Sequence, residues 1–161
     1  MFVRKRVTSS MPISINPMMM RQIIMDHYEH PHNKRTPNDD RYRKINMNSE
    51  SCIDNIDVFL LVENGIVKDC CFDGIGCTIS TASTSIMTDL VIGKSISEVE
   101  KIIENYKKMI AEDEFDEELL DEAIVFINTS KQASRIKCAT IGWNGLKDLI
   151  KENGGDDNGQ K

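Results

Sequence analysis

Three cysteines and one aspartate stand at positions from which they could act on one ion: Cys52, Asp54, Cys77 and Cys138. Thiolates and carboxylates are zinc ligands, and thiolates also hold iron–sulfur clusters. Cys52 and Asp54 are two residues apart, so in an extended segment their side chains point to the same side. These residue types predict metal or sulfur chemistry, provided that the fold brings them together.

Cys77 follows an apolar segment that contains Gly74 and Gly76, and it precedes small side chains that allow another backbone to approach closely. We expect a helix from Cys77 to Val91, ending at Gly93, because glycine readily adopts the left-handed conformation that ends a helix. The first turn of a helix has unpaired N–H groups and partial positive charge, and both favour a thiolate. The sequence therefore predicts a presented thiol at residue 77.

A β-hairpin is expected around Asn64 and Gly65, because apolar runs flank them and both residues tolerate a positive φ angle. At least one face of the hairpin would be buried. Strands joined by a tight turn bring their far ends together. Cys77, at the exit of the hairpin, is therefore expected near Cys52 and Asp54 at its entry.

Three further helices are predicted from the spacing of their apolar residues. The first covers about residues 18–30. The second opens with a capping box that begins at Ser97. The last covers about residues 134–152, and it carries Cys138 near its first turn.

Two polar segments complete the chain. Residues 33–48 are polar and charged, which indicates a loop. Residues 98–122 contain eleven acidic residues and three lysines. We interpret this second segment as a solvated helix face, with a docking surface as the alternative.

Three histidines, His27, His30 and His32, lie close together in the sequence around Pro31. A metal site is one interpretation of this group. We favour a structural role, because the proline separates the histidines, no cysteine lies nearby in the sequence, and a histidine suits the C-terminal end of a helix.

The spacing of the cysteines matches no compact Cys-x-x-Cys motif, so spacing alone leaves two alternatives equally open. One is a shared metal site, and the other is a set of thiols buried separately in the core. Cys70 and Cys71 illustrate the second, since neighbours in a strand point to opposite faces and cannot both join one site. Five cysteines are an odd number, which argues against a disulfide framework and favours reduced thiols in a cytoplasm.

The chain has 161 residues and 40% hydrophobic content, which predicts a single globular domain. We expect a disordered leader at residues 1–17, one domain at 18–152 and a disordered tail at 153–161. A net charge of −6 argues against nucleic acid or an anionic membrane as the partner, and no apolar run is long enough to span a bilayer. Residues 1–25 are basic without an acidic residue, so organelle import is the alternative to a cytoplasmic location.

Four segments occur in the order seen in U-type iron–sulfur cluster assembly proteins, the family of IscU, SufU and the N-terminal part of NifU. The segments are Asp26–Lys34, Cys52–Asp54, Gly74–Ser83 and Arg135–Thr140. The resemblance covers about residues 18–152. It is closest to the SufU-type branch, because a long acidic insertion separates the second and third cysteines and because Lys137 stands where IscU-type scaffolds carry a histidine.

The resemblance implies an α+β fold with a small antiparallel β-sheet packed against helices. It implies a zinc site made of Cys52, Asp54, Cys77 and Cys138. It also implies that Cys52 accepts persulfide sulfur from a SufS-type pyridoxal-phosphate-dependent cysteine desulfurase, with Arg135 at the interface with that partner. A protein of this kind would be a zinc-dependent sulfurtransferase. The alternative within the family is a scaffold that builds a [2Fe–2S] cluster on the same ligands and passes it to other cluster-assembly proteins.

The chain departs from the usual family pattern Asn-Pro-x-Cys-Gly-Asp in its first motif, where it has Ile53 in place of the glycine. An isoleucine adds a side chain and removes easy access to a positive φ angle. The loop is therefore expected to hold Cys52 differently from the family pattern.

Overall fold

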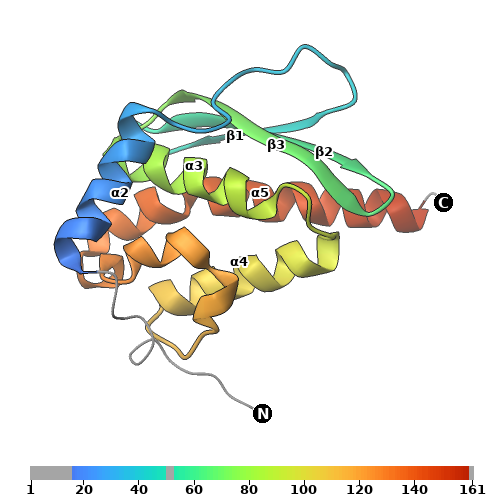
Figure 1. Ribbon diagram of the computed structural model, residues 1–161. Coiled ribbons are helices and arrows are strands. Elements are labelled where there is room, and N and C mark those ends of the chain that lie inside the picture. Colours follow the sequence, from blue (N-terminus) through green and yellow to red (C-terminus); the bar gives the residue numbers. More distant parts are fainter. Residues whose placement is uncertain (1–15, 50–52, 160–161) are drawn as a thin grey trace.

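The computed structural model describes residues 16–49 and 53–159, and side chains are described as far as residue 152. Its elements, in chain order, are α2 (Pro17–Glu29), β1 (Arg43–Asn48), β2 (Asn55–Glu63), β3 (Ile66–Ile75), α3 (Thr78–Val91), α4 (Ile96–Ile110), the 3-10 helices η2 (Glu117–Leu119), η3 (Asp121–Phe126) and η4 (Thr129–Lys131), and α5 (Ala133–Gly159). Figure 1 shows the sheet as one layer, α3 and α5 packed along one of its faces, and α4 on the far side of those helices. The predicted α+β fold is confirmed.

The sheet has three antiparallel strands in the order β1-β2-β3. Strands β2 and β3 form the predicted hairpin, and Glu63 pairs with Ile66 across the turn. Asn64 and Gly65 have φ angles of 56° and 76°. Two successive residues with positive φ make a turn whose twist matches that of the flanking strands. The turn therefore aligns the far end of the hairpin, where the site residues lie.

The prediction of a loop over residues 33–48 is wrong for its last six residues, because residues 43–48 form strand β1. Exposure alternates along this strand, with Ile45 and Met47 packed against the core. Helix α5 covers that face so closely that a side chain on Gly145 would lie 2.8 Å from Met47. An edge strand with only two apolar residues has a weak alternating pattern, so the sequence alone does not indicate it.

Helix α3 lies at the centre of the molecule and is buried along most of its length. Its small side chains let α5 approach, as expected: the Ser83 hydroxyl donates to the Ala139 carbonyl at 2.7 Å and accepts from the Trp143 indole N–H at 3.0 Å. A side chain on Gly142 would lie 2.3 Å from Oγ1 of Thr84. The position of α5 against α3 is therefore set by close contacts.

The start of α4 differs from the prediction by two residues. Ser95, not Ser97, is the N-cap, and its hydroxyl and the Glu98 carboxylate form the capping box. The serines lie two residues apart, and each is followed within three residues by a glutamate, so the sequence pattern fits both positions.

The first half of the acidic segment lies in α4, where Glu98, Glu100 and Glu104 are exposed as predicted for a solvated helix face. Its second half, after residue 110, forms turns and short 3-10 helices instead of an α-helix. Four consecutive residues of η3 are buried: Ala123, Ile124, Val125 and Phe126. A run of four apolar neighbours cannot share one face of an α-helix, because residues on one face recur every three to four positions. Helices α2, α3 and α4 all contact η3, so its residues are buried from several sides.

Helix α5 continues to Gly159, beyond the predicted end at residue 152. The predicted leader falls almost wholly outside the described residues, and disorder at residues 1–17 and 153–161 stays a prediction. Among the described helices, none combines the length and the apolar character needed to cross a membrane.

Candidate metal centre

Asp54, Cys77 and Cys138 come together where the open end of the hairpin meets the first turns of α3 and α5. One ligand atom from each residue lies within 4.8 Å of the others. Asp54 and Cys138 are buried, with 2% and 7% of their surface exposed, and Cys77 is partly exposed. Cys52 falls outside the described residues, so three of the four residues predicted for the site are placed together.

The hairpin brings Asp54 next to Cys77 through its last pair of residues, Asn55 and Ile75. This closure requires Gly74, which has a φ angle of 120° and whose position leaves no room for a side chain: an added Cβ would lie 2.3 Å from the Asn55 carbonyl oxygen. Glycine is suited to both the left-handed conformation and the close approach. A residue with a side chain at position 74 would therefore disturb the end of the hairpin that places Cys77.

Ser80 fixes the position of the Asp54 carboxylate relative to the Cys77 thiol. Its hydroxyl donates to Oδ1 of Asp54 at 2.8 Å, and its backbone N–H donates to Sγ of Cys77 at 3.4 Å. The same carboxylate oxygen accepts the Cys77 N–H at 3.0 Å. The sulfur is therefore the N-cap of α3, where helix N–H groups favour a negative charge.

The sequence marks Ser80 only as one of the small residues that follow Cys77, and its bond to Asp54 appears only in the structure. The signal that could have found it is its position three residues after Cys77, because an N-cap side chain commonly bonds the N–H group at that spacing. Gly76 leaves the space for it, since a side chain there would lie 2.5 Å from the Ser80 hydroxyl oxygen.

Cys70 and Cys71 are both fully buried, which confirms the prediction that they are small core residues. Burial raises the pKa of the Cys70 thiol far above its ordinary value and raises the pKa of Cys71 to about 11. Both side chains therefore stay as uncharged thiols at neutral pH. Neither is part of the group formed by Asp54, Cys77 and Cys138.

The rim of this centre is partly apolar and partly basic. Ile53 and Ile75 expose 63% and 65% of their surface at the end of the hairpin. Arg135 is exposed in the first turn of α5 and lines a groove of about 320 Å³, together with Arg21 of α2 and Ile79 of α3. Exposed apolar side chains are a feature of protein-binding surfaces.

Residues 19–151 match the family described as the NifU-like N-terminal domain. The chain is 38% identical to the zinc-dependent sulfurtransferase SufU of Bacillus subtilis over 139 residues, covering 85% of this chain and 93% of that protein. It is also 38% identical to the iron–sulfur cluster assembly scaffold protein IscU of Thermotoga maritima, covering 63% of this chain and 72% of that protein.

Solved structures agree with these matches. A putative iron–sulfur cluster assembly scaffold protein for the SUF system, from Fervidobacterium islandicum, superimposes with a TM-score of 0.71 at 30% identity, covering 80% of this chain and 94% of that one. The chain therefore belongs to the NifU-like N-terminal domain family, and its relatives include both SufU and IscU proteins.

Proposed function

We propose that this protein acts in iron–sulfur cluster assembly as a zinc-dependent sulfur acceptor, taking persulfide sulfur from a cysteine desulfurase onto Cys52. The observation that carries the proposal is the convergence of Asp54, Cys77 and Cys138 from three separate elements. The high coverage of a relative named as a zinc-dependent sulfurtransferase supports the same function.

The donor set of this centre fits zinc. Two thiols and a carboxylate are zinc ligands, and a tetrahedral site needs one more. Cys52 is the natural fourth ligand, because only two peptide units separate it from Asp54, and covalent geometry keeps their Cα atoms within about 8 Å. When bound, zinc would keep these thiols deprotonated. The proposed ligands are therefore Cys52, Asp54, Cys77 and Cys138.

The proposed reaction is a sulfur exchange at Cys52. Its thiolate attacks the terminal sulfur of the persulfide on the desulfurase, the sulfur–sulfur bond of that persulfide breaks, and the desulfurase cysteine leaves as a thiolate. A new sulfur–sulfur bond forms on Cys52, so one persulfide replaces another and no external oxidant or reductant is needed.

We propose that the partner is a SufS-type pyridoxal-phosphate-dependent desulfurase. It would dock at the exposed side chains of Ile53, Ile75 and Arg135, which lie close in sequence to the residues of the centre and offer apolar surface and a positive charge. We further propose that the protein works in the cytoplasm, where reducing conditions keep metal-binding thiols free of disulfides.

A second candidate function is a scaffold on which a [2Fe–2S] cluster is built. Relatives named as IscU scaffold proteins favour it, and the same sulfur ligands suit such a cluster. Metal analysis of the freshly purified protein separates the two candidates. About one zinc per chain in a colourless protein supports the sulfur acceptor, whereas iron with visible cluster absorption supports the scaffold.

Replacing Cys52 tests the acceptor role directly. We expect Cys52→Ser to abolish stimulation of desulfurase turnover and to remove the persulfide label from this protein, while circular dichroism shows a folded domain. Ser51→Ala, one residue away, is the matched control and should retain both. Stimulation that survives in Cys52→Ser would remove this residue from the acceptor role.

A further inference from the structure

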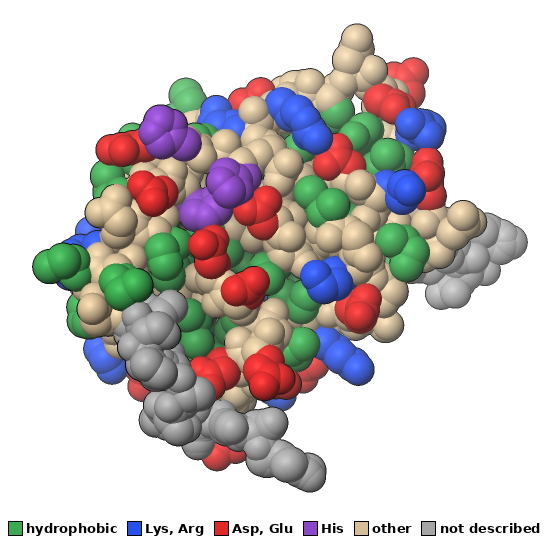
Figure 2. Space-filling view, viewed as in Figure 1, with side chains coloured by type: hydrophobic (Ala, Val, Ile, Leu, Met, Phe, Trp, Pro, Cys, Tyr) green, Lys and Arg blue, Asp and Glu red, His purple; other side chains and the backbone are tan. Residues whose placement is uncertain are grey.

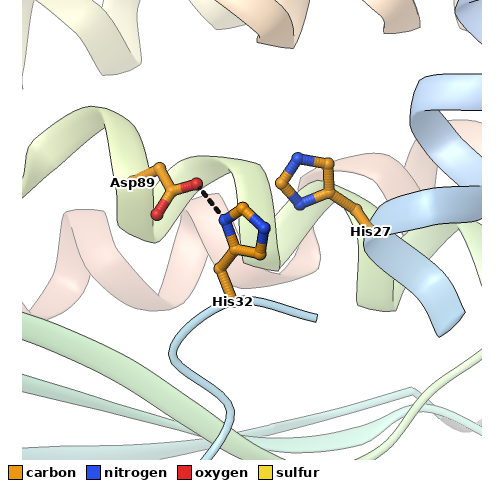
Figure 3. A group of neighbouring side chains, drawn as sticks. All are labelled: His27, His32 and Asp89. Carbon is orange, nitrogen blue, oxygen red and sulfur yellow. Dashed lines mark hydrogen bonds and ion pairs between the residues drawn. The ribbon is translucent and has the colours of Figure 1, made fainter. Parts of the chain in front are cut away.

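A second group of metal-binding side chains lies at the opposite end of α3. His27 comes from the last turn of α2, His32 from the segment that follows it, and Asp89 from the last turn of α3 (Figure 3). One ligand atom from each lies within 4.8 Å of the others, and the two imidazole ring centroids are 4.4 Å apart. His30 is not part of this group.

We propose that His27, His32 and Asp89 form a second metal site, selective for a borderline divalent ion such as Zn²⁺. Two imidazoles and one carboxylate are a donor set that zinc accepts, with a fourth position left for water. The set contains no thiol, so it differs in chemistry from the centre at Cys77. His27 and His32 are five positions apart at the end of α2, and the packing of α2 on α3 brings Asp89 next to them.

The group has the supporting contacts that metal ligands need. Nε2 of His27 lies 2.9 Å from a Glu122 carboxylate oxygen, and the Asn33 side chain donates to Oδ1 of Asp89 at 3.2 Å. A carboxylate that accepts a hydrogen bond from the ring nitrogen that does not bind the metal orients the imidazole and makes it a better ligand. Asp89 keeps its other oxygen, Oδ2, toward His32.

Metal binding would exchange the hydrogen bonds of these side chains for bonds to the ion, and Nδ1 of His32 and Oδ2 of Asp89 would have to move apart to make room for it. His27 with its proton on Nε2 donates to Glu122, and its Nδ1 then accepts from the Ser85 hydroxyl, 2.7 Å away. A metal ion would take the Nδ1 lone pair, and the Ser85 hydroxyl could turn to the carbonyl one helical turn back, as helical serines commonly do. Its oxygen would keep the bond that it accepts from the His32 N–H at 2.8 Å.

The ion would replace the proton shared between His32 and Asp89, whose Nδ1 and Oδ2 atoms are 2.5 Å apart. The ligands have graded access: the side chains of His32 and Asp89 are 54% and 43% exposed, while that of His27 is 5% exposed. An ion can thus enter from solvent and reach a fixed inner ligand. Figure 2 shows histidine and acidic side chains gathered on this face of the molecule.

This site is separate from the centre at the other end of α3. Asp89 is twelve positions after Cys77, which corresponds to roughly 18 Å along a helix. One chain could therefore hold two ions at once. The second ion would fasten the end of α2 to α3, and α2 also provides Arg21 to the groove beside Arg135.

The experiment is a titration of the full-length protein, already carrying one zinc per chain, with further Zn²⁺. We expect the wild type to bind a second equivalent, and His32→Gln and Asp89→Asn to bind it at least about tenfold more weakly. Glu122→Gln should weaken it by about tenfold through loss of ring orientation. His30→Gln is the matched control, because it removes an exposed histidine at the same helix end, and it should bind like the wild type.

Two spectroscopic readouts locate the ion. With Co²⁺ as the probe, the second equivalent should add ligand-field bands without further thiolate charge-transfer absorption. Zn²⁺ should shift the ring nitrogen signals of His27 and His32 in NMR spectra but leave those of His30 unchanged. A wild type that binds no second equivalent would overturn the proposal, and so would a His32→Gln variant that binds it undiminished.

Discussion

At the scale of single residues, Ser80 is the side chain that links the two predicted ligands Asp54 and Cys77. It bonds to both of them, one through its hydroxyl and one through its backbone N–H. Because Ser80 is fully buried, no water can readily replace the hydroxyl. A ligand carboxylate held in this way keeps one orientation before metal arrives, which favours affinity.

Ser80→Ala should therefore weaken zinc binding without unfolding the protein. Removing the hydroxyl leaves Asp54 with the Cys77 N–H but without its second donor. We expect about tenfold weaker zinc affinity by competition with a chelating dye, and a loss of about 1 kcal/mol in the free energy of unfolding of the metal-free protein.

Ser97→Ala is the control for this variant, because Ser97 is exposed in α4 and lies outside the candidate centre. It should change neither quantity. Equal zinc affinity in Ser80→Ala and the wild type would show that the carboxylate needs no such support.

At the scale of elements, the packing of α5 on α3 decides where Cys138 lies. Gly142 is one helical turn after Cys138, on the same face of α5, and it touches Thr84 of α3. Ser83 adds a hydrogen bond to the intervening turn through the Ala139 carbonyl. The distance between these two helices therefore controls whether the third sulfur can reach the site.

Gly142→Ala should push the two helices apart. The new methyl group would lie 2.3 Å from Oγ1 and 2.9 Å from Cγ2 of Thr84. Alanine gains about 1 kcal/mol in helix propensity, but overpacking costs about 1–3 kcal/mol. We expect a net loss of stability in denaturant unfolding, together with weaker zinc binding because Cys138 moves with its helix.

Thr84→Ala in the same chain should restore part of both losses, because it removes the two atoms that the methyl group meets. The Thr84 hydroxyl has no hydrogen-bond partner among the described residues, so its removal sacrifices no such bond. Additive effects in this double-mutant cycle would contradict a direct contact between the two positions.

At the scale of the whole molecule, the hydrophobic core contains large buried side chains that are not part of the candidate metal centre. Trp143 stacks on Tyr106 with ring centroids 4.0 Å apart, and Phe126 meets the Tyr106 ring edge-on. These three large side chains are fully buried and join α4, α5 and η3. The core can therefore keep the domain folded when the metal is removed.

Chelation of zinc should lower the melting temperature without unfolding the domain at 25 °C. Zinc at a hundred times its dissociation constant stabilises by about 2.7 kcal/mol, which corresponds to roughly 5–11 °C for a domain of this size. Thermal unfolding with and without a chelator measures this shift, and far-ultraviolet circular dichroism should change little. Complete unfolding on chelation would instead indicate that zinc only holds the fold together.

Much of the fold follows from the sequence, because local patterns carry it. Asn64 and Gly65 specify the hairpin turn, Gly93 follows the end of α3, and the small residues of α3 indicate a close helix contact. Strand β1 and the 3-10 helices could not be predicted from the sequence. The conformation of an edge strand, and of the consecutive buried residues in η3, depends on the elements that pack against them.

The sequence by itself determined which residue types were available for metal and sulfur chemistry, and it placed Cys77 at the start of a helix. Only the tertiary structure decided that Asp54, Cys77 and Cys138 share one place and that Cys70 and Cys71 do not. It also joined His27 and His32 to Asp89, more than fifty residues away. The physical reason is the same in each case. The ligands of one site come from different elements, and the spacing of residues along the chain does not determine how those elements pack.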